Sequence, residues 1–134
     1  MADKTKIYIG CSLTHATPEF RQSVEDLKDS LRGDYEIFDF LGLTDGTVQD
    51  VYNRDIHECV ANCDLFVAIC DHPSLGLGYE LATAVEKLDK PVLAVAHTDA
   101  HITRLVLGIT SPKYSFERYE DISDIAGLIR AKLL

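Results

Sequence analysis

The chain has 134 residues, of which 46% are hydrophobic and 26% charged, and its formal net charge is −9. This length suits one domain with its own core, and we expect residues 1–134 to form a single domain. The negative charge disfavours a nucleic-acid backbone or an anionic membrane as partner, although a local pocket of backbone amides can still hold a small anion.

The N-terminal sequence MADKTKIYIG lacks the apolar region of a signal peptide, and no apolar run approaches the ~20 residues of a membrane span. We therefore expect a cytoplasmic protein with reduced cysteines. Cys59 and Cys63 are four residues apart and could bind a metal ion together with His57 or His72, but their apolar neighbours favour buried thiols. We expect no metal and no cofactor.

Short apolar runs alternate along the chain with segments whose apolar residues recur at helical spacing. Thr17 and Pro18 are typical of the cap and first residue of a helix. The expected strands are residues 6–11, 35–40, 64–70, 91–96 and 113–119. The expected helices are residues 20–31, 48–62, a segment containing Leu81 to Leu88, 102–107 and 122–134.

This alternation predicts an α/β fold: a flavodoxin-like, doubly wound sheet of about five mostly parallel strands in the order 2-1-3-4-5, with helices on both faces. In that order the sheet reverses direction between its first and third strands, and ligands bind there at the carboxyl ends of the strands. Residues 10–15 and 71–80 follow those two strands and are the predicted site.

The most informative stretch is DHPSLGLGYELATAVE, residues 71–86, between a buried strand and a helix. We expect Gly76 and Gly78 to form a tight turn that frees backbone N–H groups for an anion, with Ser74 adding a hydroxyl. Glu80 would lie in or near the first helical turn, where the helix dipole favours an ionised carboxylate. A sugar phosphate whose reactive carbon is distant from its phosphate would fit both features. The alternative is an ordinary N-terminal helix acid.

The string PSLGLGYELATAVE resembles the signature of the nucleoside 2-deoxyribosyltransferase-like family, near its 2'-deoxynucleoside 5'-phosphate N-hydrolase branch. The resemblance extends from Lys6 to about Gly108. It implies that Glu80 is the nucleophile and that Ser74 and Gly76 bind a 5'-phosphate. The other residues that it places at the pocket are Tyr8, beside the nucleophile, Gly10 and Ser12 in the first loop, and Gly78.

The resemblance also implies that Asp55 assists the leaving base, as the second carboxyl group of a retaining glycosidase scheme. Family members usually place this aspartate eight residues before the aspartate of the next strand, whereas Asp55 and Asp64 are nine apart. One additional helical residue turns a side chain by about 100°. The alternative is a solvated acid paired with Arg54 or His57.

Two features bear on substrate and assembly. Cys11 stands where relatives often have glycine, and Leu13-Thr14 lacks an arginine found in some nucleotide-cleaving members. Thr103 aligns with a polar residue that family dimers donate to the neighbouring subunit's site. Residues 102–107 are apolar on more than one face, which favours a homodimer with shared sites, or a higher homo-oligomer.

We therefore expect cleavage of the N-glycosidic bond of a 2'-deoxyribonucleoside or its 5'-monophosphate through a covalent glutamyl-deoxyribosyl intermediate, with this small molecule as the partner. Water as acceptor gives hydrolysis and a second base gives transfer; the sequence leaves both open. A non-catalytic nucleotide-binding module is the alternative. A response-regulator-like domain would need clustered acids after the first strand, where Gly10, Cys11 and Ser12 provide none.

Overall fold

Five parallel strands form one sheet in the order β2-β1-β3-β4-β5, in a computed structural model that describes residues 3–134. The predicted fold class and strand order are confirmed. Each predicted strand is present, with ends shifted by up to two residues. The strands are β1 Lys6–Cys11, β2 Glu36–Phe38, β3 Leu65–Ile69, β4 Val92–His97 and β5 Tyr114–Tyr119.

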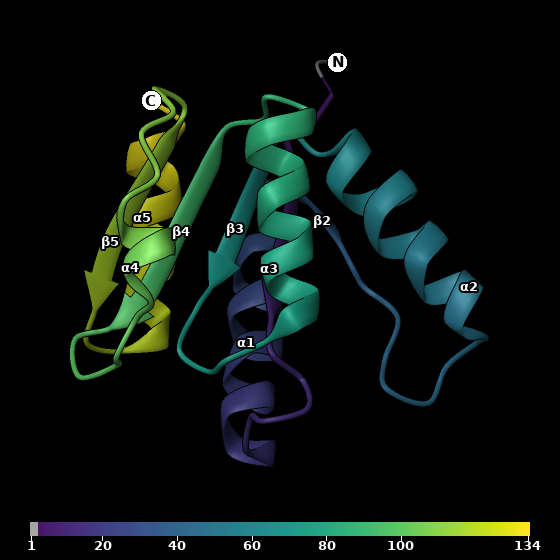
Figure 1. Cartoon of the computed structure of the whole chain (residues 1–134). Coiled ribbons are helices and arrows are strands. Elements are labelled where there is room, and N and C mark those ends of the chain that lie inside the picture. The colour runs from purple at the N-terminus through teal and green to yellow at the C-terminus, as the bar shows by residue number, and fades with distance from the viewer. Residues whose placement is uncertain (1–2) are drawn as a thin grey trace.

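Helices cover both faces of this sheet, with α2 and α3 in front of it and α1 and α5 behind it in Figure 1. Two of them continue directly into π-helical segments, η1 after α2 and η2 after α3. Their bounds are α1 Pro18–Leu31, α2 Val48–Tyr52, η1 Asn53–Val60, α3 Leu75–Ala82, η2 Thr83–Lys87, α4 Arg104–Leu107, the 3-10 turn η3 Ile122–Asp124 and α5 Ile125–Lys132. None of the helices in residues 3–134 has the length and apolar character needed to span a lipid bilayer.

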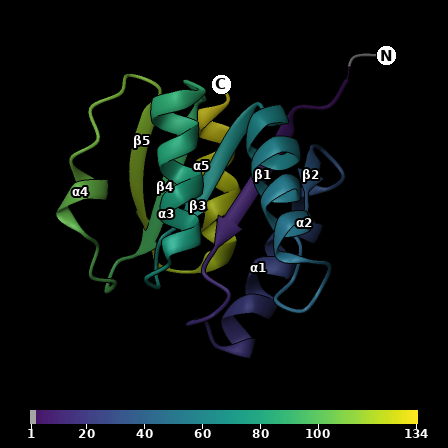
Figure 2. The ribbon, with the colours of Figure 1, turned by 45° about the vertical axis from the view of Figure 1, so that its right-hand side comes forward.

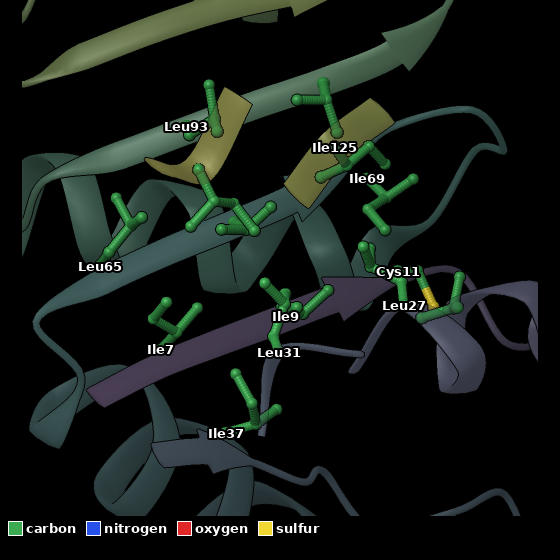
Figure 3. Close-up of a cluster of buried hydrophobic side chains, with 14 of the residues drawn as sticks. Ile7, Ile9, Cys11, Leu27, Leu31, Ile37, Leu65, Ile69, Leu93 and Ile125 are labelled. Carbon is green, nitrogen blue, oxygen red and sulfur yellow. The ribbon is translucent and has the colours of Figure 1, made fainter. Parts of the chain in front are cut away.

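Side chains alternate across β1 and so contribute to two separate cores. Ile7 and Ile9 point to the face covered by α1 and α5, as Figure 3 shows. Tyr8 points to the opposite face and packs with Phe66 beneath α2 and α3. The pleat of a central strand therefore brings a tyrosine hydroxyl to the layer that contains the predicted site.

The predicted cap of the first helix is confirmed. Thr17 accepts a hydrogen bond from the Phe20 N–H at 3.1 Å, and Pro18 is the first helical residue. Figure 2 shows the carboxyl ends of the strands pointing to the same edge as the loop between β2 and α2. That edge is where an open α/β sheet binds its ligands.

We predict that Gly10→Ala destabilises the protein by about 1–3 kcal/mol, because overpacking a filled core forces its neighbours to move. A Cβ at Gly10 would lie 3.0 Å from the Phe66 ring and 3.2 Å from Leu77 Cδ1. Gly127→Ala in α5 is the matched control, since its Cβ would meet nothing within 4 Å. It should stabilise the helix by about 0.5–1 kcal/mol. Urea unfolding of both variants tests the pair, and equal effects would contradict the packing argument.

Candidate active site

Helix α3 begins earlier than the sequence predicts. Ser74 is its cap, with Oγ accepting from the Leu77 N–H at 3.0 Å. Gly76 and Gly78 are therefore helical residues, and the expected tight turn at these glycines is wrong. A turn and a glycine-containing first helical turn give the same local sequence pattern. Glu80 consequently lies in the second turn, where its environment depends on burial more than on the helix terminus.

Glu80 is a buried acid whose side chain meets Tyr8 across the layer between β1 and α3. Only 9% of Glu80 is exposed, and its Oε2 accepts a hydrogen bond from the Tyr8 hydroxyl. Burial raises the pKa of Glu80 to about 8; the Tyr8 hydrogen bond opposes this rise and the charge of Asp55 adds to it. Burial and the neighbouring Glu80 and Asp55 carboxylates raise the pKa of Tyr8, which therefore keeps its proton and remains a donor.

Asp55 shares a cavity with Glu80. The cavity has a volume of about 160 Å³ and lies between α2 and α3. Asp55 Oδ1 accepts from the Leu41 N–H at 3.4 Å. Burial raises the pKa of Asp55, against the opposing effects of the Leu41 hydrogen bond and the Arg54 charge. The cavity is lined by Tyr52, Asp55, Ile56, Gly76, Tyr79 and Glu80 among others.

The alternative role of Asp55, a solvated partner of Arg54 or His57, does not match the contacts of these residues. Arg54 instead donates to the Asp39 carbonyl at 2.8 Å and pairs with Glu58 at 3.6 Å. No ion pair of Asp55 occurs within residues 3–134. Its carboxyl group therefore faces the cavity and the loop after β2.

The nine-residue interval between Asp55 and Asp64 is accommodated by the π-helical segment η1. Within it the Ala61 N–H donates to the Ile56 carbonyl, five residues back. A π turn contains one residue more than an α turn. It can therefore accommodate one additional residue without rotating the side chains of the preceding residues about the helix axis. Asp55 lines the Glu80 cavity with this nine-residue interval in place. Single π turns inside α-helices are frequent at functional sites.

We predict that deleting Glu58, an exposed residue of η1, leaves Asp55 in place. The segment would then revert to α-helix with an eight-residue interval, so the melting temperature should change by only a few degrees. Deleting Asp26 from the regular helix α1 is the control. It would rotate Val24 by about 100° relative to Leu27 and Leu31 and should prevent folding. Thermal unfolding of both deletion variants tests this prediction. An equal loss of melting temperature in the two variants would contradict the idea that the π turn accommodates one additional residue.

The predicted substrate-binding residues around α3 line two different cavities. The second cavity lies on the other side of α3 from Glu80 and has a volume of about 270 Å³. Ser74, Gly78 and Thr103 line it, whereas Gly76 lines the cavity of Glu80. Thr103 caps α4, with Oγ1 accepting from the Leu105 N–H at 3.3 Å. Within one chain, Thr103 thus faces the Ser74 side of α3.

Gly10 and Ser12 have structural contacts of their own. Gly10 lies against Phe66 and Leu77, which gives a packing reason for glycine. Ser12 is 1% exposed; its hydroxyl donates to the Pro73 carbonyl at 3.3 Å and accepts from the His15 N–H at 3.4 Å. This hydroxyl ties the loop after β1 to the loop after β3.

Three aromatic residues near the site were missed in the sequence. Tyr52 and Tyr79 face each other at the Glu80 cavity with ring centroids 6.5 Å apart, and both are more than a third exposed. Phe40 meets the Tyr8 ring edge-on at 6.5 Å. Tyr79 stands inside the motif, directly before Glu80, and was the available signal. Within residues 3–134 no group of three or more His, Cys, Asp or Glu could hold a metal ion, and all four cysteines are free.

The parallel sheet, the buried Glu80–Tyr8 pair and the PSLGLGYE motif agree with the resemblance to the nucleoside 2-deoxyribosyltransferase-like family, and two curated proteins are similar to the chain. The chain is 34% identical over 98 residues to a protein of Syntrophotalea carbinolica named "Putative 2'-deoxynucleoside 5'-phosphate N-hydrolase 1", covering 73% of this chain and 66% of that protein. A Thermofilum pendens protein of the same name is 32% identical over 80 residues, covering 58% of this chain and 54% of that protein.

The matched segments thus span less than two thirds of these curated relatives. Among solved structures, the Clostridium botulinum CMP N-glycosidase BcmB superposes with a TM-score of 0.71. The superposition covers 94% of this chain and 99% of that one at 17% identity, which establishes a shared fold. No protein-family model matches the chain.

Proposed function

We propose that this protein cleaves the N-glycosidic bond of a 2'-deoxyribonucleoside or its 5'-monophosphate, with Glu80 as the nucleophile that forms a glutamyl-deoxyribosyl intermediate. The observation that carries the proposal is the buried Glu80 carboxyl group, which accepts from Tyr8 and faces a cavity shared with Asp55. Two carboxyl groups at one cavity are what retaining glycoside cleavage requires. The names of the relatives, an N-hydrolase and an N-glycosidase, support the same chemistry.

The protonation states of the Glu80 and Asp55 carboxyl groups follow from their surroundings. With a pKa of about 8, Glu80 of the free protein holds a proton at neutral pH. The retaining scheme needs that proton on Asp55, so that Glu80 attacks the anomeric carbon while Asp55 protonates the departing base. Interacting carboxyl groups titrate as a pair, so the reactive species is the singly protonated pair with its proton on Asp55.

Glu80→Gln tests the nucleophile. The amide retains the shape of the side chain and an acceptor for Tyr8, but it cannot form the ester, so turnover should fall by at least about a thousandfold. Glu86→Gln, an exposed acid on η2, is the matched control and should keep the wild-type rate. Base release from deoxynucleosides and deoxynucleotides is measured by chromatography, with and without a free acceptor base to separate transfer from hydrolysis. A Glu80 variant that keeps more than about a tenth of the rate contradicts the assignment.

The pH dependence tests Asp55. If the reactive species is singly protonated, wild-type kcat/KM should fall above a pH of about 8, where the pair loses its last proton. In Asp55→Asn the leaving base receives no proton from residue 55, so the lower residual rate should instead rise with pH as Glu80 ionises. The midpoint should also be lower, because the Asp55 charge that raises the Glu80 pKa is gone. An unchanged alkaline limb in Asp55→Asn rules out Asp55 as the acid.

For a 5'-monophosphate, we propose that the phosphate binds at the N-terminus of α3. The side-chain oxygen of Ser74 accepts from Leu77, so its hydroxyl proton is free to be donated to an anion. Gly76 exposes its backbone in the first helical turn, where N–H groups and the helix dipole favour negative charge. Because Gly76 also lines the Glu80 cavity, a phosphate here would lie at the edge of that cavity, and the deoxyribose would extend from it toward Glu80, which keeps the phosphate apart from the reacting carbon.

We further propose that the protein acts as a homodimer with shared sites. Ile102 is buried, but Leu105 is 81% exposed and Leu107 44%, which leaves one apolar side of α4 uncovered. Leu75, at the start of α3, is 97% exposed. A two-fold contact over these residues would cover them and bring Thr103 toward the partner's Ser74 and Gly76.

Light scattering at micromolar concentration should therefore give twice the mass of one chain. Inactive Glu80→Gln and inactive Thr103→Trp proteins, mixed and re-associated, should recover about a quarter of wild-type activity, since half of the dimers then contain one intact site. The same mixture with Glu86→Gln in place of Thr103→Trp is the control and should keep about half of wild-type activity, whether or not the subunits exchange. A fully active monomer would overturn both the dimer and the shared site.

A further inference from the structure

Lys28 on α1 is a buried lysine that the proposed chemistry does not use. Only 1% of its surface is exposed, and its Nζ lies 3.4 Å from Glu25 Oε1 and 3.7 Å from Asp39 Oδ1. Burying an ammonium group is costly even when it is paired, and a hydrophobic side chain of similar volume is often at least as stable in such a place. The stability of the fold therefore does not explain a charge at this position.

Asp39, the acidic partner of Lys28, directly follows the edge strand β2 and is held from both faces of the sheet. Arg32, one turn after Lys28 on α1, donates from Nη2 to both carboxylate oxygens of Asp39, at 3.0 and 3.3 Å. On the other face, Arg54 of η1 donates from Nε to the Asp39 carbonyl at 2.8 Å. Two cations of α1 and one of η1 thus fix the backbone at the point where β2 ends.

Phe40 follows Asp39 and connects the two cores, because its ring packs against buried residues of both. Lys28 Nζ lies 4.1 Å from the centroid of this ring, a distance at which an ammonium group is attracted to an aromatic face. The ring also meets Tyr8 edge-on, with centroids 6.5 Å apart, and the Tyr8 hydroxyl donates to Glu80. One aromatic ring thus separates the charge of Lys28 from the tyrosine that holds Glu80.

Leu41, the next residue, completes the connection to the second carboxyl group. Its N–H donates to Asp55 Oδ1 at 3.4 Å. This distance is longer than that of a typical N–H···O hydrogen bond, so a small displacement of the backbone breaks it. Because Asp39, Phe40 and Leu41 are consecutive, a displacement of the first two residues moves the third. The hydrogen bond to Asp55 therefore depends on the contacts that Lys28 makes.

We infer that Lys28 is a positioning residue, which acts through Asp39 and Phe40 on the carboxyl groups at the other face of the sheet. The inference rests on the proposed function. With the charge in place, the Leu41 N–H reaches Asp55. Without it, Asp39 loses one of its two cations from α1 and the Phe40 ring loses the ammonium group over its face, so both residues are free to shift. Lys28 does not line the cavity of the two carboxyl groups, so its loss should affect the rate of bond cleavage more than the affinity for substrate.

Lys28→Met tests the inference, because methionine retains the length of the side chain and removes its charge. The melting temperature should stay the same or rise, since an apolar group replaces a buried charge. The kcat for base release should fall about tenfold or more, because small displacements of reacting groups are costly in rate. KM should change less than about twofold. A residue with a structural role alone would instead lower the melting temperature and leave kcat unchanged.

Two further variants complete this experiment. Asp39→Asn should also lower kcat, and the double variant Lys28→Met/Asp39→Asn should show no further decrease, since both residues act through one path. Lys87→Met, which changes an exposed lysine on η2, is the matched control and should keep the wild-type kcat, KM and melting temperature.

A second measurement follows Leu41 directly and needs no catalysis. The pH dependence of its amide proton shift, measured by NMR, should report the ionisation of Asp55 in the wild-type protein, and Asp55→Asn should abolish this part of the response. The other charged or titratable groups that act on Asp55 or respond to it are Arg54 and Cys59 on η1, Glu80 on α3 and Tyr8 on β1. Comparison with Asp55→Asn removes their contributions. Lys28→Met should lose most of the Asp55-dependent response, and Lys87→Met should retain it.

The two measurements separate this inference from the proposed reaction. If no base is released from any deoxynucleoside or deoxynucleotide but Lys28→Met loses the Leu41 response, the proposed reaction is wrong and the positioning by Lys28 stands. If substrate is cleaved and Lys28→Met keeps both the wild-type kcat and the Leu41 response, the reaction stands and the positioning is wrong. A Leu41 response that persists in Lys28→Met overturns the inference whatever the rate. If Lys28→Met does not fold, Asp39→Asn, whose side chain is half exposed, decides by the same two measurements.

Discussion

The contact on which the site depends is the hydrogen bond between the Tyr8 hydroxyl and the buried Glu80 carboxyl group. Removing a carboxylate from water is costly, and a buried carboxyl group instead keeps its proton unless donors surround it. Tyr8 is one such donor, and it reaches Glu80 only because it occupies the helix-covered face of β1. A slip of one residue in the pairing of β1 with β3 would move Tyr8 to the opposite core and leave Glu80 without this donor.

The second carboxyl group depends on an irregularity of the helix that carries it. Asp55 faces the Glu80 cavity because η1 contains a π turn between it and β3. The neighbouring helix shows the same feature, since the Leu88 N–H donates to the Thr83 carbonyl in η2, again five residues back. Regular helices of these lengths would present different side chains to the space between them. The geometry of the cavity is therefore determined by hydrogen-bond spacing within the helices as much as by side-chain identity.

The order of the sheet and the position of the site were predictable because both follow from patterns local to each element. Apolar strands alternate with amphipathic helices, and the motif directly follows β3. The start of α3 was mispredicted because the pattern of Gly76 and Gly78 fits a tight turn and a first helical turn equally well. The π turn left no sign in the composition of residues 53–60, and only the count of residues to Asp64 signalled it. A cavity of about 400 Å³ between α1 and the loop after β2 was not predicted, since it combines two segments that are distant in sequence.

Charge connects these features. A net charge of −9 repels a nucleotide at long range, so affinity for the proposed substrate must come from contacts at short range. An ionised Glu80 would add to that repulsion beside the N-terminus of α3, where we place the phosphate. Because burial raises the pKa of Glu80 to about 8, the Glu80–Asp55 pair of the free protein carries one negative charge instead of two at neutral pH, which reduces this repulsion. Burial therefore has two effects: it lowers the electrostatic cost of binding, and it leaves a poorly solvated carboxylate once Glu80 ionises. A poorly solvated anion attacks an electron-deficient carbon more readily than a hydrated one, so the same low-polarity setting favours both binding and the proposed attack.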